Sequence, residues 1–316
     1  MFGRTKNIVM WALTYRCNMS CDYCFLRDKV KKWEELSDDE CIRIAEFIAQ
    51  DKTWRPDAVW LTGGEPTIKS CLVDIIKILE TSGVRCVITS NGLFNEKTLN
   101  EIISASPRGI NISLESVEDE KNNYFRGYTQ SVIESIKQIA KNKNNNTILG
   151  VSCVVSQRNI NDLFQFALKL KELGVEYLSI NPLIGNSTSY QNEEISQLIE
   201  SSQRIKNDLG MIIPSDFYFS MLGQYFSQNT PLLKCPSGDH YFFISPWGKC
   251  YPCSNEIWQN TSDAKELLYS FPNVKELLSH IQDTFHTDTI TTCSNCFGDR
   301  CIGCWKLYYD TVFTKK

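Results

Sequence analysis

Three cysteines stand close together near the start of the chain, in the segment "CNMSCDYC", at Cys17, Cys21 and Cys24. Iron–sulfur clusters take thiolate ligands, and a short loop lets three thiolates surround one face of a four-iron cube. Three local ligands leave the fourth iron with an open coordination position, which a substrate or a cofactor can occupy. The spacing therefore predicts a [4Fe–4S] cluster that takes part in chemistry and does not merely transfer electrons.

Two other uses of these cysteines are disfavoured. A structural zinc ion takes four protein ligands, and no fourth ligand stands near the first three in the sequence. A disulfide scaffold is typical of small secreted proteins, whereas this chain has 316 residues and no recognisable export signal. Four scattered cysteines lie within apolar patterns and are predicted to be buried hydrophobic side chains: Cys41, Cys71, Cys86 and Cys153.

The first two thirds of the chain alternate strand and helix patterns, which predicts an α/β fold with a parallel sheet and right-handed crossovers. Ser37 and Glu40 form the pattern of a capping box at the first helix. Six units are too few for a complete eight-unit barrel, so we expect a partial, open (β/α)6 barrel. Strands are predicted at 7–14, 57–64, 84–92, 109–115, 147–156 and 175–183, and helices at 36–50, 72–79, 96–104, 129–142, 160–174 and 192–209.

The predicted strands bring the polar motifs to one edge of the sheet. The cysteine loop follows the first strand, "GGEP" (63–66) follows the second, and "SNG" (90–92) follows the third. In such barrels the chemistry lies at the carboxyl ends of the strands. We therefore expect the three motifs to surround a common site.

This ordered set of motifs resembles the radical S-adenosylmethionine (SAM) superfamily. The match covers residues 7–185 and includes the aromatic Tyr23 before the third cysteine, "TSNG" at 89–92 and "ISLE" at 112–115. The resemblance implies that the open iron binds the amino and carboxylate groups of SAM. It further implies that an electron, from a protein such as flavodoxin or ferredoxin, cleaves SAM to a 5'-deoxyadenosyl radical that abstracts a substrate hydrogen.

The same resemblance implies roles for residues around the cluster. The GGE-type loop holds the methionine amino group, polar residues on the fourth and fifth strands hold the ribose and the carboxylate, and the guanidinium fork of Arg126 suits a carboxylate. The cluster ligands are then Cys17, Cys21 and Cys24. The SAM-binding residues are Gly63, Gly64, Glu65, Ser113, Glu115, Arg126 and Ser152.

Beyond about residue 215 the chain is aromatic, rich in turn residues and rich in cysteine, with a hairpin predicted to turn at Pro246–Gly248. This region is similar to the SPASM and twitch domains that carry auxiliary clusters in radical SAM enzymes. We therefore predict a barrel domain at 1–220 and a small cysteine-rich domain at 221–316. The predicted auxiliary ligands are Cys235, Cys253, Cys293, Cys296, Cys301 and Cys304.

The number of auxiliary clusters stays open. The final spacings of four and two residues depart from the usual five and three, and seven cysteines are present where two complete sites need eight. One or two auxiliary [4Fe–4S] clusters are therefore expected. Radical epimerases use a cysteine to return a hydrogen atom, and Cys250 is a candidate for that role, with a plain ligand or an inert thiol as the alternatives.

The resemblance favours modification of a ribosomally made peptide, by Cα epimerisation or by cross-link or thioether formation. One alternative is a radical dehydrogenase or epimerase of an aminocyclitol or aminoglycoside, and another is a non-catalytic iron–sulfur protein. The net charge of -4 and the absence of a long apolar stretch argue against nucleic-acid and membrane partners, and a cytoplasmic location is expected.

Overall fold

The structure is a computed structural model that describes residues 7–24, 26, 34–183, 190–216, 218–219, 240–252 and 268–285. Its centre is one curved sheet with the strand order β6-β5-β4-β3-β2-β1-β7-β8. All neighbouring strands are parallel except β7 and β8. The strands are β1 Ile8–Thr14, β2 Ala58–Gly63, β3 Arg85–Ser90, β4 Gly109–Ser113, β5 Ile148–Val155, β6 Tyr177–Pro182, β7 Tyr241–Ile244 and β8 Cys250–Tyr251.

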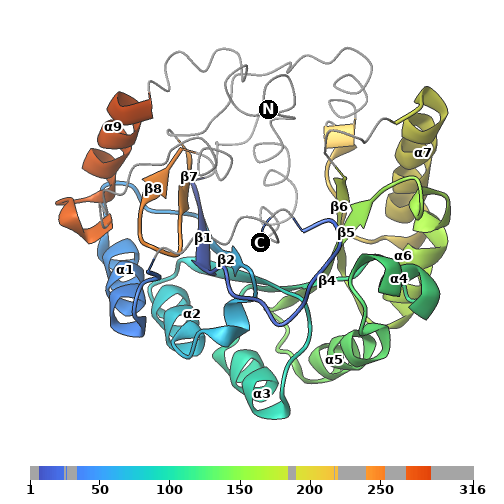
Figure 1. The fold of residues 1–316 in the computed structure, drawn as a ribbon, viewed down its shortest axis with the longest axis horizontal. Coiled ribbons are helices and arrows are strands. Elements are labelled where there is room, and N and C mark those ends of the chain that lie inside the picture. Colours follow the sequence, from blue (N-terminus) through green and yellow to red (C-terminus); the bar gives the residue numbers. More distant parts are fainter. Residues whose placement is uncertain are drawn as a thin grey trace.

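The helices that connect β1 to β6 lie on the outer side of the curved sheet (Figure 1). This arrangement confirms the predicted fold class, a partial α/β barrel. The helices are α1 Asp38–Gln50, α2 Leu72–Thr81, α3 Glu96–Ala105, α4 Asp119–Phe125, α5 Thr129–Asn142, α6 Leu163–Glu172, α7 Asn192–Leu209 and α9 Val274–Phe285. Short 3-10 helices are η1 Pro66–Ile68, η2 Ile160–Asp162 and η4 Leu268–Ser270.

Local signals explain why the predicted helices form where they do. The Ser37 side chain accepts a hydrogen bond from the Glu40 N–H, and the Glu40 carboxylate accepts one from the Ser37 N–H, so the predicted capping box begins α1. The apolar face of α1, with Ile44 and Ile48, is buried in the hydrophobic core. The four scattered cysteines are also buried, as predicted.

Two helices were not predicted. α4 lies in the polar segment that follows β4, where few apolar residues reveal a helical period, and it carries Arg126 at its C-terminal end. α9 lies in the C-terminal region and packs its apolar residues, among them Leu277 and Ile281, into the core. The prediction failed at α4 because its apolar pattern is short. The apolar residues of α9 do follow a helical period, so this helix could have been predicted from its sequence.

The predicted hairpin is present, as β7 and β8, and it continues the barrel sheet. β7 pairs in parallel with β1, from Ile8 opposite Tyr241 to Trp11 opposite Ile244. The sheet thus runs across the predicted boundary at residue 220, and the division into two domains stays a prediction. Among the helices of the described residues, none combines the length and the apolar character that a membrane span requires.

Candidate functional site

The loop that carries Cys17, Cys21 and Cys24 follows β1 at the carboxyl edge of the sheet. Cys17 is exposed, and Cys21 and Cys24 are half-buried. The Met19 N–H donates to Cys17 Sγ at 3.4 Å, and the Cys24 N–H donates to the Cys21 carbonyl at 3.1 Å. The loop therefore holds its three thiols on one short, internally hydrogen-bonded segment, which we call the cluster loop (residues 15–24).

Glu35 anchors the start of the cluster loop, a role that the sequence did not reveal. Its carboxylate accepts hydrogen bonds from Thr14 Oγ1 at 2.8 and 2.9 Å and from the Tyr15 N–H at 2.8 Å. The Arg16 guanidinium lies 3.5 Å from the same carboxylate. Glu35 stands just before α1, so the start of the first helix also positions the cluster loop.

The GGEP loop lies directly against the cluster loop. The Gly64 N–H donates to the Thr14 carbonyl at 2.7 Å, and the Glu65 N–H donates to the Arg16 carbonyl at 2.9 Å. A Cβ on Gly63 would stand 2.2 Å from the Thr14 carbonyl oxygen, and one on Gly64 would stand 2.3 Å from that of Arg16. Only glycine permits this approach of two backbones, which explains the two glycines of the motif.

We expect Gly63→Ala to destabilise the protein more than Gly210→Ala, by about 2 kcal/mol or more, because it breaks the hydrogen bonds between the two loops at about 1 kcal/mol each. Both glycines have positive φ, of 132° and 61°, but nothing lies within 4 Å of a Cβ on Gly210. Urea denaturation of the two variants measures the combined cost of the close contact and of the φ of 132°, which lies outside the left-handed region that the φ of 61° occupies. Equal losses of stability would show that the contact does not matter.

Glu65 is fully buried and ties the end of β2 to the end of β3. One carboxylate oxygen accepts from Ser90 Oγ at 2.9 Å and from the N–H and hydroxyl of Thr67 at 3.1 and 2.8 Å, and the other accepts from the Asn91 N–H at 2.7 Å. Burial raises the pKa of Glu65, and these hydrogen bonds oppose the rise. The carboxylate is thus occupied by protein donors, and its predicted contact with SAM stays a prediction.

Asn91 is a site residue that the sequence analysis did not single out, although it lies in the "SNG" motif. Its Nδ2 lies 2.6 Å from Asn18 Oδ1 and 3.8 Å from Cys17 Sγ. The third strand therefore contributes a side-chain contact to the cluster loop. The position of the motif at a strand end was the signal that could have identified it.

A buried ion pair supports the other side of the cluster loop. The Arg126 Nε donates to one oxygen of Glu115, and a second guanidinium nitrogen lies 2.9 Å from the other oxygen. The Tyr23 hydroxyl donates to Glu115 at 2.7 Å and accepts from Arg126. The Glu115 side chain is fully buried and that of Arg126 is 10% exposed. The structure thus directs Arg126 toward Glu115, and its predicted pairing with the SAM carboxylate stays a prediction.

The predicted SAM-binding serines lie next to each other, Ser113 at the end of β4 and Ser152 within β5. Ser113 pairs in register with Ser152, and both are partly accessible. Asn181 on β6, which was not predicted, donates from Nδ2 to Ser152 Oγ at 3.2 Å and to Ser179 Oγ at 3.0 Å. These side chains form an uncharged polar edge that offers donors and acceptors for hydroxyl groups.

The donor set of the cluster loop fits an iron–sulfur cluster. Burial raises the pKa of Cys21 to about 11 and also raises that of Cys17, so binding of iron as thiolates releases protons. Within the described residues, no three Cys, His, Asp or Glu side chains gather as the ligands of a single metal ion would. Three thiolates from one short loop can each bind one iron corner of the cube, whereas a structural zinc ion takes four protein ligands.

The predicted C-terminal sites are only partly within the described residues. Cys250 is buried at the start of β8, opposite Ile244 of β7. Its role as a hydrogen donor stays a prediction. The six predicted auxiliary ligands lie outside the described residues: Cys235, Cys253, Cys293, Cys296, Cys301 and Cys304.

Comparison with known families identifies the superfamily of the chain. The profile described as "Radical SAM superfamily" matches residues 11–170, just over half of the chain. The chain belongs to the radical SAM superfamily. Members of this superfamily use a [4Fe–4S] cluster and SAM, which confirms the predicted cofactors. The predicted auxiliary clusters also agree with the relatives described below.

This chain matches several relatives over almost its whole length. It is 25% identical over 312 residues to a GTP 3',8-cyclase of Thermodesulfovibrio yellowstonii, covering 90% of this chain and 92% of that protein. It is also 25% identical over 298 residues to a probable GTP 3',8-cyclase of Saccharolobus islandicus, covering 91% of each. Among solved structures, SuiB of Streptococcus suis bound to SAM has a TM-score of 0.70 at 14% identity, covering 96% of this chain and 72% of SuiB, which shows the fold alone.

These relatives correct the predicted function. Modification of a ribosomally made peptide, with an aminocyclitol or aminoglycoside as the alternative substrate, is wrong, because the relatives that match the chain end to end are named as GTP 3',8-cyclases. The alternative of a non-catalytic iron–sulfur protein also fails, since the chain belongs to a superfamily of enzymes. The physical reason is that cysteine spacings report the ligation of clusters and carry no information about the molecule that binds beside them.

Proposed function

We propose that this radical SAM enzyme acts on a guanine nucleotide, in the manner of the GTP 3',8-cyclases. The observation that carries the proposal is the length of the similarity, which covers 90% of this chain and 92% of the relative. The shared superfamily profile ends at residue 170, so the likeness extends well past it. Similarity over both the barrel and the C-terminal region supports a shared substrate class and not only a shared cofactor.

On this proposal, Cys17, Cys21 and Cys24 hold the cluster. When bound, the cluster and SAM supply reductive cleavage of SAM and abstraction of a hydrogen atom from the substrate. The protein keeps the cluster loop in place from three sides, through Glu35, through the GGEP loop with Glu65 and Asn91, and through Glu115. A flavodoxin or ferredoxin is proposed as the electron donor, and the predicted cytoplasmic location stays a prediction.

The remaining site residues would bind and orient SAM. Ser113, Ser152 and Asn181 present hydroxyl and amide groups on adjacent strands, which suits the hydroxyls of a ribose. Gly63 and Gly64 let the backbone of the GGEP loop come close to the cluster loop, where the amino group of SAM is proposed to lie. The predicted auxiliary ligands would hold further clusters.

The proposal is tested by anaerobic reconstitution of the full chain with iron and sulfide, followed by incubation with dithionite, SAM and GTP. We expect GTP to stimulate the formation of 5'-deoxyadenosine and to be converted to a new product, both measured by liquid chromatography and mass spectrometry. ATP in place of GTP is the matched control. Equal 5'-deoxyadenosine with GTP, with ATP and without nucleotide, together with unchanged GTP, would refute the proposal.

A further inference from the structure

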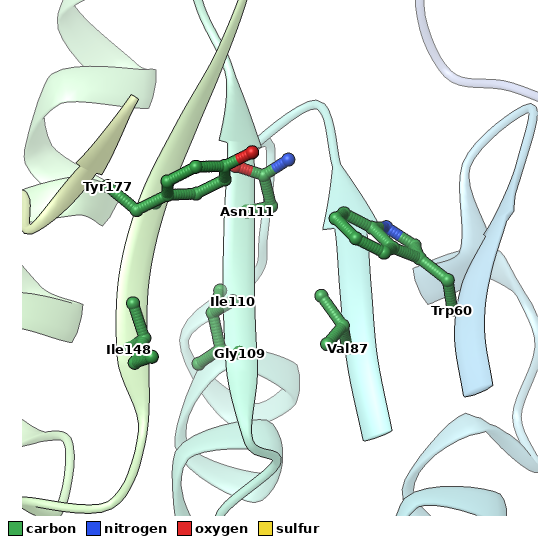
Figure 2. A pocket seen from close by; sticks show the side chains of 8 residues that line it. Trp60, Val87, Gly109, Ile110, Asn111, Ile148 and Tyr177 are labelled. Carbon is green, nitrogen blue, oxygen red and sulfur yellow. The ribbon is translucent and has the colours of Figure 1, made fainter. Parts of the chain in front are cut away.

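The hollow on the inner face of the sheet is small. Trp60 on β2 and Tyr177 on β6 lie on either side of Asn111 (Figure 2), and the hollow that they border has room for about one water molecule. A water molecule there can donate to Asn111 Oδ1, which has no partner among the described residues. A larger ligand does not fit, so the chemistry is left to the strand ends, where the cluster loop lies.

The end of α4 holds the second half of the cluster loop (residues 21–24). The Asp22 N–H donates to the Phe125 carbonyl at 3.1 Å, and the Phe125 ring meets the Tyr23 ring edge-on, with the ring centres 6.0 Å apart. Arg126, which follows α4, donates to the Tyr23 hydroxyl. Asp22 and Tyr23 are the two residues between the second and third cysteines of the loop. The position of these two cysteines therefore depends on where α4 ends.

Asn122 of α4 joins this helix end to its surroundings. The residue is fully buried. Its Oδ1 accepts from the Glu115 N–H at 3.2 Å, and its Nδ2 donates to the Gly127 carbonyl and to Thr129 Oγ1, both at 3.2 Å. One side chain thereby connects the segment after β4, the turn after α4 and the first residue of α5.

The turn that Asn122 spans has a backbone that its sequence does not favour. Gly127 and Tyr128 both have positive φ, of 79° and 59°, and the left-handed region is uncommon for a tyrosine. The Tyr128 side chain is 57% exposed, so burial of its ring does little to hold this conformation. The amide of Asn122 bonds to the residues on both sides of Tyr128, and these bonds stabilise the turn.

We propose that Asn122 is a positioning residue for the radical SAM cluster. By fixing the turn after α4, it places Phe125 and Arg126 against Asp22 and Tyr23, and so holds the second half of the cluster loop. It acts through these residues and is not itself a cluster ligand. The first half of the loop is held separately, by Glu35 and by the GGEP loop. The inference concerns the loop itself and is independent of the substrate.

The apo protein provides a test that needs no cluster. Asn122→Leu removes the three hydrogen bonds and keeps a side chain of similar size. We expect Cys21 and Cys24 to react with iodoacetamide about tenfold faster than in the wild type, because the end of α4 opens more often. The rate at Cys17, in the first half of the loop, should stay as in the wild type. Peptide mass spectrometry of partly alkylated protein measures each cysteine separately.

A pair of milder variants keeps the test decisive if Asn122→Leu does not fold. Thr129→Val removes one acceptor of the Asn122 amide. Thr147→Val is the matched control, because Thr147 is a buried threonine that donates to the Pro107 carbonyl at 2.7 Å just before β5. The two threonines are 1% and 2% exposed. We expect Thr129→Val to raise the alkylation rates of the second and third cysteines about threefold, and Thr147→Val to leave them unchanged.

Iron analysis after anaerobic reconstitution is the second measurement, and Thr129→Val should retain less iron than Thr147→Val. Equal alkylation rates in these two variants would overturn the proposal. So would an equal rise at all three cysteines of Asn122→Leu, since a general loss of stability exposes both halves of the loop. Failure of GTP to react would refute the proposed function and leave these alkylation rates unaffected, so the two failures are distinguishable.

Discussion

Replacing Glu115 with alanine is expected to lower the free energy of unfolding by about 3–5 kcal/mol, because the change leaves the charge of Arg126 buried without its partner. The Glu115 side chain is fully buried, and its oxygens accept hydrogen bonds from both Arg126 and Tyr23. Tyr23 lies between two cysteines of the cluster loop. We therefore also expect the variant to retain less iron after reconstitution than the wild type.

The measurement is anaerobic urea denaturation of the apo protein, combined with iron analysis after reconstitution. Glu134→Ala is the matched control, since Glu134 pairs with Lys137 on the surface at 3.7 Å, where such a pair contributes about 0–1 kcal/mol. Glu115→Gln keeps an acceptor for Tyr23 and is expected to lose less iron than Glu115→Ala. A loss of stability in Glu115→Ala no greater than that of the control would contradict the role of this ion pair.

Replacing Cys17, Cys21 and Cys24 together with alanine is expected to remove about four iron atoms per chain and to abolish the formation of 5'-deoxyadenosine. Any auxiliary clusters should remain, because their predicted ligands stand between Cys235 and Cys304. Iron and sulfide analysis and the EPR spectrum of the reduced protein, with and without SAM, measure the change.

Cys86→Ala is the matched control for the triple variant, because Cys86 is a buried cysteine of β3 that packs in the core. It should retain all of its iron and lose only some stability. If the triple variant keeps the iron content of the wild type and SAM still perturbs its EPR spectrum, the cluster loop does not hold the radical SAM cluster.

Much of the fold could be predicted from local patterns. The bounds of α5 and α7 match the predicted 129–142 and 192–209. In both segments the apolar residues recur at the helical period, and this pattern is visible in the sequence alone. The capping box of Ser37 and Glu40 marked the start of α1 for the same local reason. The meeting of the cluster loop and the GGEP loop also followed from the sequence, since the ends of successive parallel strands lie at one edge.

The contacts that hold the site together could not be predicted in this way. Glu35 and Glu115 look like other carboxylates in the sequence, and only the fold shows that each faces the cluster loop. The pairing of β7 with β1 joins residues more than 230 positions apart. The close approach of Gly150 to Asn111 and Tyr177 likewise depends on the register of β4, β5 and β6.

By itself, the sequence determined the cofactor chemistry and the order of the barrel strands, because cysteine ligation and hydrophobic periodicity depend on residues that are close together in the chain. Only the tertiary structure decided which carboxylates support the cluster loop and which side chains line the inner face. Those depend on burial and on contacts between distant strands. The same distinction explains the incorrect prediction of a peptide substrate, since a substrate is recognised by such an assembled surface and not by the spacing of cluster ligands.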